Sequence, residues 1–284
     1  MANLKEIRNR IASVSSTMQI TSAMKMVSAA KLKKAQDAIT AMRPYSDKLT
    51  ELLQNLSATL DADSGSKFSE QRDVKNVLIV AITSNRGLCG AFNSNIIKQA
   101  TAAASSYDSK VSIVAIGKKA NDALSKNFEV ISNQSPVFDD LTFDNVAAIA
   151  EMLMEQFESK AFDKIEVIYN KFKNAATQEI MTEQFLPIEP LENDTNANLD
   201  YIFEPSKEEI IETLIPKSLK TQLYKSIRDS FASEHGARMT AMHKATDNAT
   251  ELRDQLKLTY NKARQASITN EILEIVGGAE ALNG

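Results

Sequence analysis

Apolar residues, with a few polar interruptions, recur at alternating steps of four and three near the beginning of the chain. The positions are Leu4, Ile7, Ile11, Val14, Met18, Thr21, Lys25, Ser28, Leu32, Ala35, Ile39 and Met42. This heptad spacing is typical of a helix that pairs with another helix in a coiled coil. Pro44 should kink this helix rather than end it, because good helix formers follow. The spacing predicts one coiled-coil helix over residues 1–60.

A second heptad repeat occupies the other end of the chain. Its positions are Met242, Ala245, Ala249, Leu252, Leu256, Thr259, Ala263, Ala266, Asn270 and Leu273. A continuous helix from Lys207 to Val276 would be roughly 100 Å long at 1.5 Å per residue, too long for a compact domain of this size. The two helical ends are therefore predicted to pair with each other, antiparallel, as a left-handed coiled coil that projects from a folded middle.

The middle of the chain alternates strand and helix patterns. Predicted strands cover residues 74–83, 110–117, 163–174 and 177–188, the last two as a hairpin, and predicted helices cover residues 93–105, 118–126 and 142–161. This alternation is typical of an α/β sheet domain. The expected fold class is α/β: a long coiled coil of the terminal helices plus a Rossmann-like domain. The expected domains are residues 1–60, 74–205 and 207–284, the first and last forming one rod.

Charge is unevenly distributed along the chain. Residues 1–60 carry nine basic and four acidic side chains, a net charge of +5, and residues 217–264 carry ten and five, again +5. The chain as a whole has a net charge of −4. Two basic ends beside an acidic middle predict an acidic partner surface for the ends. A nucleic acid is the weaker alternative, because no aromatic residues alternate with the basic ones.

The composition also limits where the protein works. One cysteine excludes an internal disulfide framework and fits a reducing compartment. The N-terminal residues have no apolar signal region, and no stretch of about 18 apolar residues predicts a membrane span.

The sequence TSNRGLCGAFN, residues 83–93, follows a predicted strand and is a candidate for phosphate chemistry. It contains only Gly87 and Gly90, with no lysine after them, and so lacks both the Walker pattern and the dinucleotide fingerprint. Cys89 could be a nucleophile only with His235 or His243 as its base, and a small buried cysteine under a turn is the preferred interpretation. These two histidines are eight residues apart, which does not suit a metal site on one helix face. We therefore expect no catalytic residues, no metal and no cofactor.

Four stretches resemble one family. IRNRIASVSSTMQITSAMKMVSAAKLKKAQ is similar to the N-terminal helix of the gamma subunit of F-type ATP synthase, and TSNRGLCGAFN to that family's glycine and cysteine turn. SEHGARMTAMHKATDNA and YNKARQASITNEILEIVGGAEAL are similar to its C-terminal helix. The chain departs from the family at Asn85, where Asp is common, and at Gly236, where Ala is usual.

The resemblance implies a non-catalytic rotor shaft. Its helices would turn inside a ring of alpha and beta subunits, and its α/β foot would sit on the membrane ring of c subunits beside the epsilon subunit. Proton flow would turn the shaft and drive the beta subunits through their catalytic conformations. The absence of a transit peptide suggests a bacterial version, peripheral on the cytoplasmic face of the cell membrane.

The resemblance also implies partner contacts for individual residues. Arg264 and Gln265 match the family's contacts with an acidic loop of beta, with Thr269 and Glu271 one turn further on. Arg238 and Met24 match positions that face beta, and Cys89 lies in a turn expected near beta. Without the resemblance, each would be an ordinary solvated flank of a coiled coil. Ile272, Leu273, Ile275 and Val276 form a broader apolar run, which we expect to seat in an apolar collar of the ring.

Two other functions remain open from the sequence alone. One is a nucleotide-linked α/β enzyme that dimerises through its coiled coil, which would bind nucleotide by itself. The other is a coiled-coil adaptor that does not rotate.

Overall fold

The computed structural model describes residues 4–57, 67–188 and 207–283. The chain divides into two compact units whose boundaries fall inside the long terminal helices. One consists of Met1–Ser28 with Met239–Gly284, and the other of Ala29–Arg238. Residues 67–73, ahead of the first strand, form no helix or strand, and residues 61–66 lie outside the described residues.

Two long helices begin and end the described chain. Helix α1 runs from Leu4 to Ser57 with Pro44 inside it, and helix α5 runs from Lys207 to Asn283 with Pro216 inside it. Both predicted helices are confirmed, and neither proline ends its helix. The near absence of glycine from these segments explains their continuity, since glycine and proline are the poorest helix formers.

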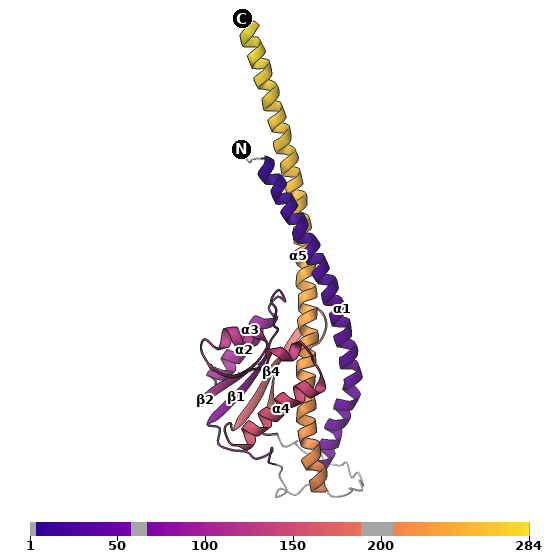
Figure 1. Ribbon diagram of the computed structural model, residues 1–284, viewed down its shortest axis with the longest axis vertical. Helices are drawn as coiled ribbons and strands as arrows, with labels where there is room; N and C mark the ends of the chain where they lie inside the picture. The colour runs from indigo at the N-terminus through magenta and orange to yellow at the C-terminus, as the bar shows by residue number, and fades with distance from the viewer. Residues whose placement is uncertain (1–3, 58–66, 189–206, 284) are drawn as a thin grey trace. The chain divides into compact units, whose positions relative to one another are not determined.

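In the first unit the helices pair in antiparallel fashion (Figure 1). The Arg8 guanidinium donates to the Tyr260 hydroxyl at 2.8 Å, and the hydroxyls of Thr21 and Thr246 are 2.8 Å apart. Higher numbers on α1 thus meet lower numbers on α5, as an antiparallel pair requires. All twelve heptad positions predicted on α1 are buried or half-buried. The predicted pairing is confirmed within this unit.

The heptad positions predicted on α5 need correction. Leu252 is 47 % exposed and Thr259 is exposed, while their neighbours Arg253 and Tyr260 are half-buried. A series of buried or half-buried positions keeps the heptad spacing, so only every second predicted position was placed one residue too early. The series is Met242, Thr246, Ala249, Arg253, Leu256, Tyr260 and Ala263. The last three predicted positions are exposed because α1 begins at Leu4 and covers nothing beyond Ala263. These positions are Ala266, Asn270 and Leu273.

The second unit contains a five-stranded sheet in the order β3-β2-β1-β4-β5. Its strands are β1 (Asn76–Ile82), β2 (Lys110–Ile116), β3 (Glu129–Asn133), β4 (Lys164–Phe172) and β5 (Gln178–Leu186). The first four are parallel, and β5 pairs antiparallel with β4 as the predicted hairpin. The structure therefore confirms the α/β class. Strand β3 was not predicted, because its alternation is short and only half-buried.

Helices cover both faces of this sheet (Figure 1). Helices α2 (Phe92–Ser105) and α3 (Lys118–Leu124) pack on one face, against the odd-numbered residues of β1. Helix α4 (Phe143–Glu158) and the first part of α5 pack on the other face, against the even-numbered residues. A strand buried on both faces is uniformly apolar, which explains the run of buried residues in β1. A short 3-10 turn, η1 (Ser135–Phe138), follows β3.

Candidate functional site

The turn after β1 brings the chain from the sheet into α2. Residues Leu88 and Gly90 both adopt the left-handed conformation, with φ of 61° and 59°. Glycine reaches this conformation without strain, whereas for leucine it costs about 1–2 kcal/mol. The Leu88 side chain is 65 % exposed at the tip of the turn. A strained, exposed apolar residue indicates that other contacts hold this turn in place.

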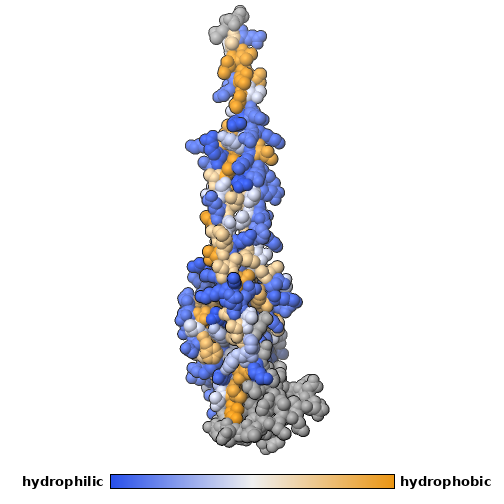
Figure 2. All heavy atoms as spheres, turned by 90° about the vertical axis from the view of Figure 1, so that its right-hand side faces the viewer, coloured by the Kyte–Doolittle hydropathy of each residue, from blue (hydrophilic) through white to orange (hydrophobic). Residues whose placement is uncertain are grey.

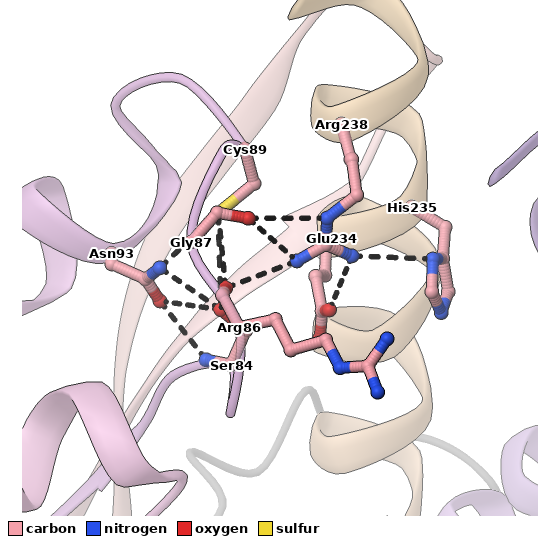
Figure 3. Close-up of polar contacts among 8 residues, drawn as sticks. All are labelled: Ser84, Arg86, Gly87, Cys89, Asn93, Glu234, His235 and Arg238. Carbon is pink, nitrogen blue, oxygen red and sulfur yellow. Dashed lines mark hydrogen bonds and ion pairs between the residues drawn. The ribbon is translucent and has the colours of Figure 1, made fainter. Parts of the chain in front are cut away.

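Cys89 lies below the surface of the turn (Figure 3). Its side chain is only 2 % exposed, and its sulfur accepts a hydrogen bond from Asn93 Nδ2 at 3.1 Å. Burial raises the pKa of the thiol above its usual value, which keeps it protonated. The preferred interpretation of Cys89 as a small buried residue is therefore confirmed. A direct contact between this sulfur and a partner would require the turn to open, so the exposed side chains of the turn are better placed for one.

Arg238 of α5 holds the same turn from the opposite side. Its Nη2 donates to the backbone carbonyl of Arg86 at 3.0 Å and of Gly87 at 3.2 Å, and its Nε also donates to Gly87 at 3.3 Å. Its Nη1 forms an ion pair with Glu234 at 2.5 Å. Arg238 is almost fully buried, so its guanidinium is occupied inside this chain rather than facing outward as the resemblance implied.

The buried ion pair lies among further charges. Burial raises the pKa of Glu234, while the positive charges of Arg238, Lys31 and Arg86 oppose that rise. A buried carboxylate is costly without a partner, and Arg238 supplies one together with a charge-assisted hydrogen bond. The pair is therefore a structural feature that depends on both of its members.

His235 lies beside this pair and stays neutral. Burial, together with the positive charges of Arg238 and Lys31, lowers its pKa to about 3. Arg238 Nη1 is 3.4 Å from Nδ1 of the ring, which makes Nδ1 the acceptor and places the proton on Nε2. Phe231 packs edge to face against the ring at 4.5 Å between centroids. Since so low a pKa makes a poor general base, the geometry gives Cys89 no activating partner here.

Asn85 connects the turn to the next strand ends. Its Nδ2 donates to the carbonyl of Ser135 at 3.0 Å, and its Oδ1 accepts from the backbone N–H of Lys118 at 3.0 Å. A carboxylate could accept but not donate, so Asn suits both contacts where the family commonly has Asp.

A shallow hollow of about 290 Å³ adjoins Asn85. Its lining is polar and carries no aromatic side chain: Asn85, Lys118, Asn121, Asp122, Asn133, Ser135, Pro136 and Asp139. Nucleotide pockets combine an apolar wall for the base with a glycine-rich phosphate loop, and this hollow has neither. It therefore does not support the nucleotide-linked enzyme.

The C-terminal end of α5 lies beyond the helix pair. The residues assigned to partner contacts here are all exposed: Arg264, Gln265, Thr269 and Glu271. Large apolar side chains are exposed among them, namely Ile268, Ile272, Leu273, Ile275 and Val276. Figure 2 shows hydrophobic side chains gathered near this end of the helix. An isolated helix of about 20 residues is marginal in water, so this segment needs a partner. Met24 lies on α1 in the helix pair and is half-buried.

Within residues 4–57, 67–188 and 207–283, no group of three or more His, Cys, Asp or Glu side chains could hold a metal ion. In the same part of the chain, no helix is both long enough and apolar enough to cross a membrane.

Comparison with known proteins gives matches over the whole chain. The family described as ATP synthase matches residues 3–282. The ATP synthase gamma chain of Flavobacterium psychrophilum is 77 % identical, and that of Flavobacterium johnsoniae is 74 % identical, each over 100 % of both chains.

Solved structures agree with this similarity. A chain from the central stalk and c-ring of the Tetrahymena thermophila mitochondrial ATP synthase has 26 % identity and a TM-score of 0.60, covering 80 % of this chain and 99 % of that one. A chain from the Euglena gracilis mitochondrial ATP synthase has 22 % identity and a TM-score of 0.70, covering 98 % of this chain and 94 % of that one, and it supports the fold.

Proposed function

Since the chain belongs to the family of ATP synthase gamma chains, we propose that it turns as the shaft of an F-type ATP synthase and couples proton flow to the catalytic cycle of the beta subunits. The gamma chain is the central stalk subunit and is not catalytic.

The unpaired end of α5 is the observation that carries the proposal. Beyond Ala263 the helix has no partner in the described chain, yet Ile272, Leu273, Ile275 and Val276 are exposed on it. Apolar side chains of this size gain about 1.5–3 kcal/mol each when buried. A collar of apolar side chains from the surrounding subunits would supply that burial. A ring of alpha and beta subunits is the partner that fits a single helix entering from one end.

Charged and polar residues at the same end would make contacts that depend on the angle of rotation. Arg264 is exposed and carries a fixed positive charge, which suits an acidic loop of beta. Gln265, Thr269 and Glu271 lie within the next two turns of the helix. Since charge pairs at exposed positions contribute little each, a set of them can guide rotation without stopping it.

The sides of the helix pair are suited to a loose sleeve. The chain has no tryptophan, and small and polar residues are exposed on the outside of α1, among them Ser13, Ser16, Thr17 and Gln19. Aromatic and arginine anchors buried in pockets dominate tight protein interfaces. A sleeve contact that lacks them keeps the barrier between angular positions low. Met24 would face beta along this part of the shaft.

The α/β domain would be the foot. We propose that it binds the ring of c subunits and the epsilon subunit, and that the complex lies on the cytoplasmic face of a bacterial membrane. The exposed side chains of the turn after β1, Arg86 and Leu88, are placed to meet the moving part of beta, with Cys89 beneath them.

Reconstitution with alpha and beta subunits tests the proposal. ATP hydrolysis by the complex should depend on this chain, and a probe on the α/β domain should rotate. Nucleotide binding by the isolated chain, with no effect on the other subunits, would instead support the enzyme alternative. If cross-linking α5 to its sleeve stops rotation but leaves ATP hydrolysis by the complex unchanged, the result would support the adaptor.

Two variants test the contacts separately. Arg264→Glu should lower ATP hydrolysis by the complex more than it lowers the stability of the isolated chain, whereas Lys262→Glu makes the same charge change on another face of α5 and should lower it less. Equal losses of hydrolysis and stability in Arg264→Glu would contradict the assignment of Arg264 as a contact with beta. Deletion of residues 272–284 should weaken assembly or rotation, and an unaltered complex would show that there is no collar seat.

A further inference from the structure

Helix α5 contacts the α/β domain in two chemically different ways. Up to Ile227 it packs mainly through apolar side chains that belong to the main core of the domain, beside one ion pair of Lys220 with Glu151 at 2.6 Å. The apolar side chains are Ile215, Leu219, Leu223 and Ile227. Apolar burial holds two surfaces together but has little directional preference. From Ser233 to Arg238 the contacts are hydrogen bonds and an ion pair, which weaken steeply when their angles change.

These polar contacts reach the turn after β1 at two places, its middle and the end where α2 begins. Arg238 donates to the carbonyls of Arg86 and Gly87 inside the turn. Ser233 Oγ donates to the carbonyl of Asn170 on β4 at 3.0 Å, and Asn170 Nδ2 donates to the carbonyl of Phe92, where α2 begins, at 3.3 Å. Figure 3 shows Arg238 and Glu234 on α5 facing the turn. The helix is therefore bound to the middle of the turn directly, and to its end through β4.

Gly236 brings a second loop against the same part of α5. A Cβ at this position would lie 3.1 Å from Ala175 Cα and 3.2 Å from its carbonyl oxygen, in the turn of the β4–β5 hairpin. Only glycine allows the hairpin to approach this closely without a shift of its backbone.

We propose that Ser233, Gly236 and Arg238, the α5 clamp, fix the rotational position of α5 about its own axis relative to the sheet, and that Arg238 is the positioning residue that transmits torque between the α/β domain and the helix. The inference rests on the proposed function, since only a rotating shaft needs such a joint.

Geometry explains why Arg238 suits this role. Its guanidinium lies roughly 8 Å from the helix axis, given a Cα radius of about 2.3 Å and an extended side chain. Turning α5 by about 20° would move that group about 3 Å, which is as long as the hydrogen bonds themselves. The planar guanidinium donates to two neighbouring carbonyls and to Glu234 at once, so the angle is fixed by several bonds. An ammonium group has no such planar fork.

Glu234 has a different task in the same cluster. Its carboxylate neutralises the buried guanidinium, and its interaction with the turn is electrostatic, with the positive charge of Arg86. Loss of this charge would destabilise the fold while leaving the donors of Arg238 directed at the carbonyls. The two residues therefore allow loss of stability to be separated from loss of positioning.

The test measures torsional stiffness in the assembled complex. The chain is reconstituted with alpha and beta subunits fixed to a surface, and a probe is attached to the α/β domain through Lys110→Cys, which is accessible whereas Cys89 is buried. The variance of the probe's angle during a catalytic pause is inversely proportional to stiffness. The variants Arg238→Met, Arg238→Lys and Glu234→Gln are compared with the parent chain, and thermal stability is measured on the same complexes.

The expected result is that stiffness and stability separate. Arg238→Lys keeps the charge and the ion pair, so it should lose stiffness with a small loss of stability, whereas Glu234→Gln should lose stability and keep its stiffness. Arg238→Met should lose both. Parent-like stiffness in Arg238→Lys, or stiffness that follows stability across the three variants, would overturn the clamp. If the parent chain supports no rotation at all, it is the proposed function that fails instead.

Discussion

The buried imidazole of His235 makes the stability of the chain depend on pH in a way that can be calculated. Its pKa is lowered from 6.5 to about 3 in the folded state. Between these values the unfolded chain binds the proton and the folded chain does not. The free energy of unfolding therefore falls as the pH falls through this window, and the contribution of the histidine is fully present above it.

The magnitude follows from the two pKa values. At about pH 5 the unfolded imidazole is almost fully protonated, while the folded one is still neutral. At about 1.36 kcal/mol per pH unit, the loss between about pH 7 and about pH 5 is about 2 kcal/mol. Because the folded form stays neutral throughout this range, the size of the loss depends chiefly on the unfolded pKa.

The variant His235→Asn isolates this contribution. Asn places its Oδ1 near the position of Nδ1, so it can still accept from Arg238 Nη1, but it does not titrate. Denaturant unfolding of the full chain is followed by circular dichroism at both pH values, and the change in unfolding free energy is compared between parent and variant. Contributions from other groups, including Glu234, are common to both chains and cancel in the comparison.

The expected outcome is a shallower pH dependence for His235→Asn, by about 2 kcal/mol over the same range. His243→Asn is the matched control substitution, because it makes the same change at a side chain that is 57 % exposed. Parallel pH dependences for the parent and His235→Asn would refute the reasoning, since the buried ring would then titrate as it does in the unfolded chain.

Three further predictions concern single positions in the α/β domain and α5. Gly236→Ala should lower stability by about 1 kcal/mol, because overpacking against Ala175 costs more than the gain in helix propensity. Gly277→Ala is the control, because a Cβ there has open space around it, and it should be neutral or stabilising. Thermal unfolding of the two variants and the parent chain measures the difference. Asn85→Asp should cost about 1–3 kcal/mol, since the carbonyl of Ser135 loses its donor, and a stability equal to the parent would contradict that role. The thiol of Cys89 should react with a maleimide only at the rate at which the turn opens, and rapid labelling would show that the sulfur is accessible. Cys89→Ala should leave ATP hydrolysis by the complex largely intact.

The periodic parts of the structure could be predicted from the sequence. The heptads gave the terminal helices and their antiparallel pairing, and the apolar runs gave β1, β2 and the β4–β5 hairpin. These elements are specified by side chains within one segment. Strand β3 was missed because its alternation covers only five residues, none of which is fully buried. On α5 every second heptad position was placed one residue too early, because the small and polar residues there do not distinguish a step of three from a step of four.

The environment of Arg238 could not be predicted, although its sequence position drew attention to it. The resemblance implied an outward-facing side chain, and the neighbouring charges suggested a solvated flank. Its main partners are backbone carbonyls of a turn about 150 residues away along the chain, and a carbonyl carries no sequence signature. The visible sign was Gly236, because a glycine inside a helix can mark the close approach of another segment, as the hairpin turn at Ala175 shows here.

The chemistry of this cluster bears on why it is polar at all. A buried ion pair contributes little net stability, and apolar residues of similar volume often stabilise a protein as well or better. Stability alone would therefore favour continuing the apolar contacts that α5 makes up to Ile227. The polar contacts of Ser233 and Arg238 are instead satisfied in one orientation of the helix. Any other orientation takes these donors away from three backbone carbonyls, those of Asn170, Arg86 and Gly87, although Arg238 keeps its ion pair with Glu234 on the same helix. This penalty for misorientation is what a shaft requires where its helix leaves the domain that turns it.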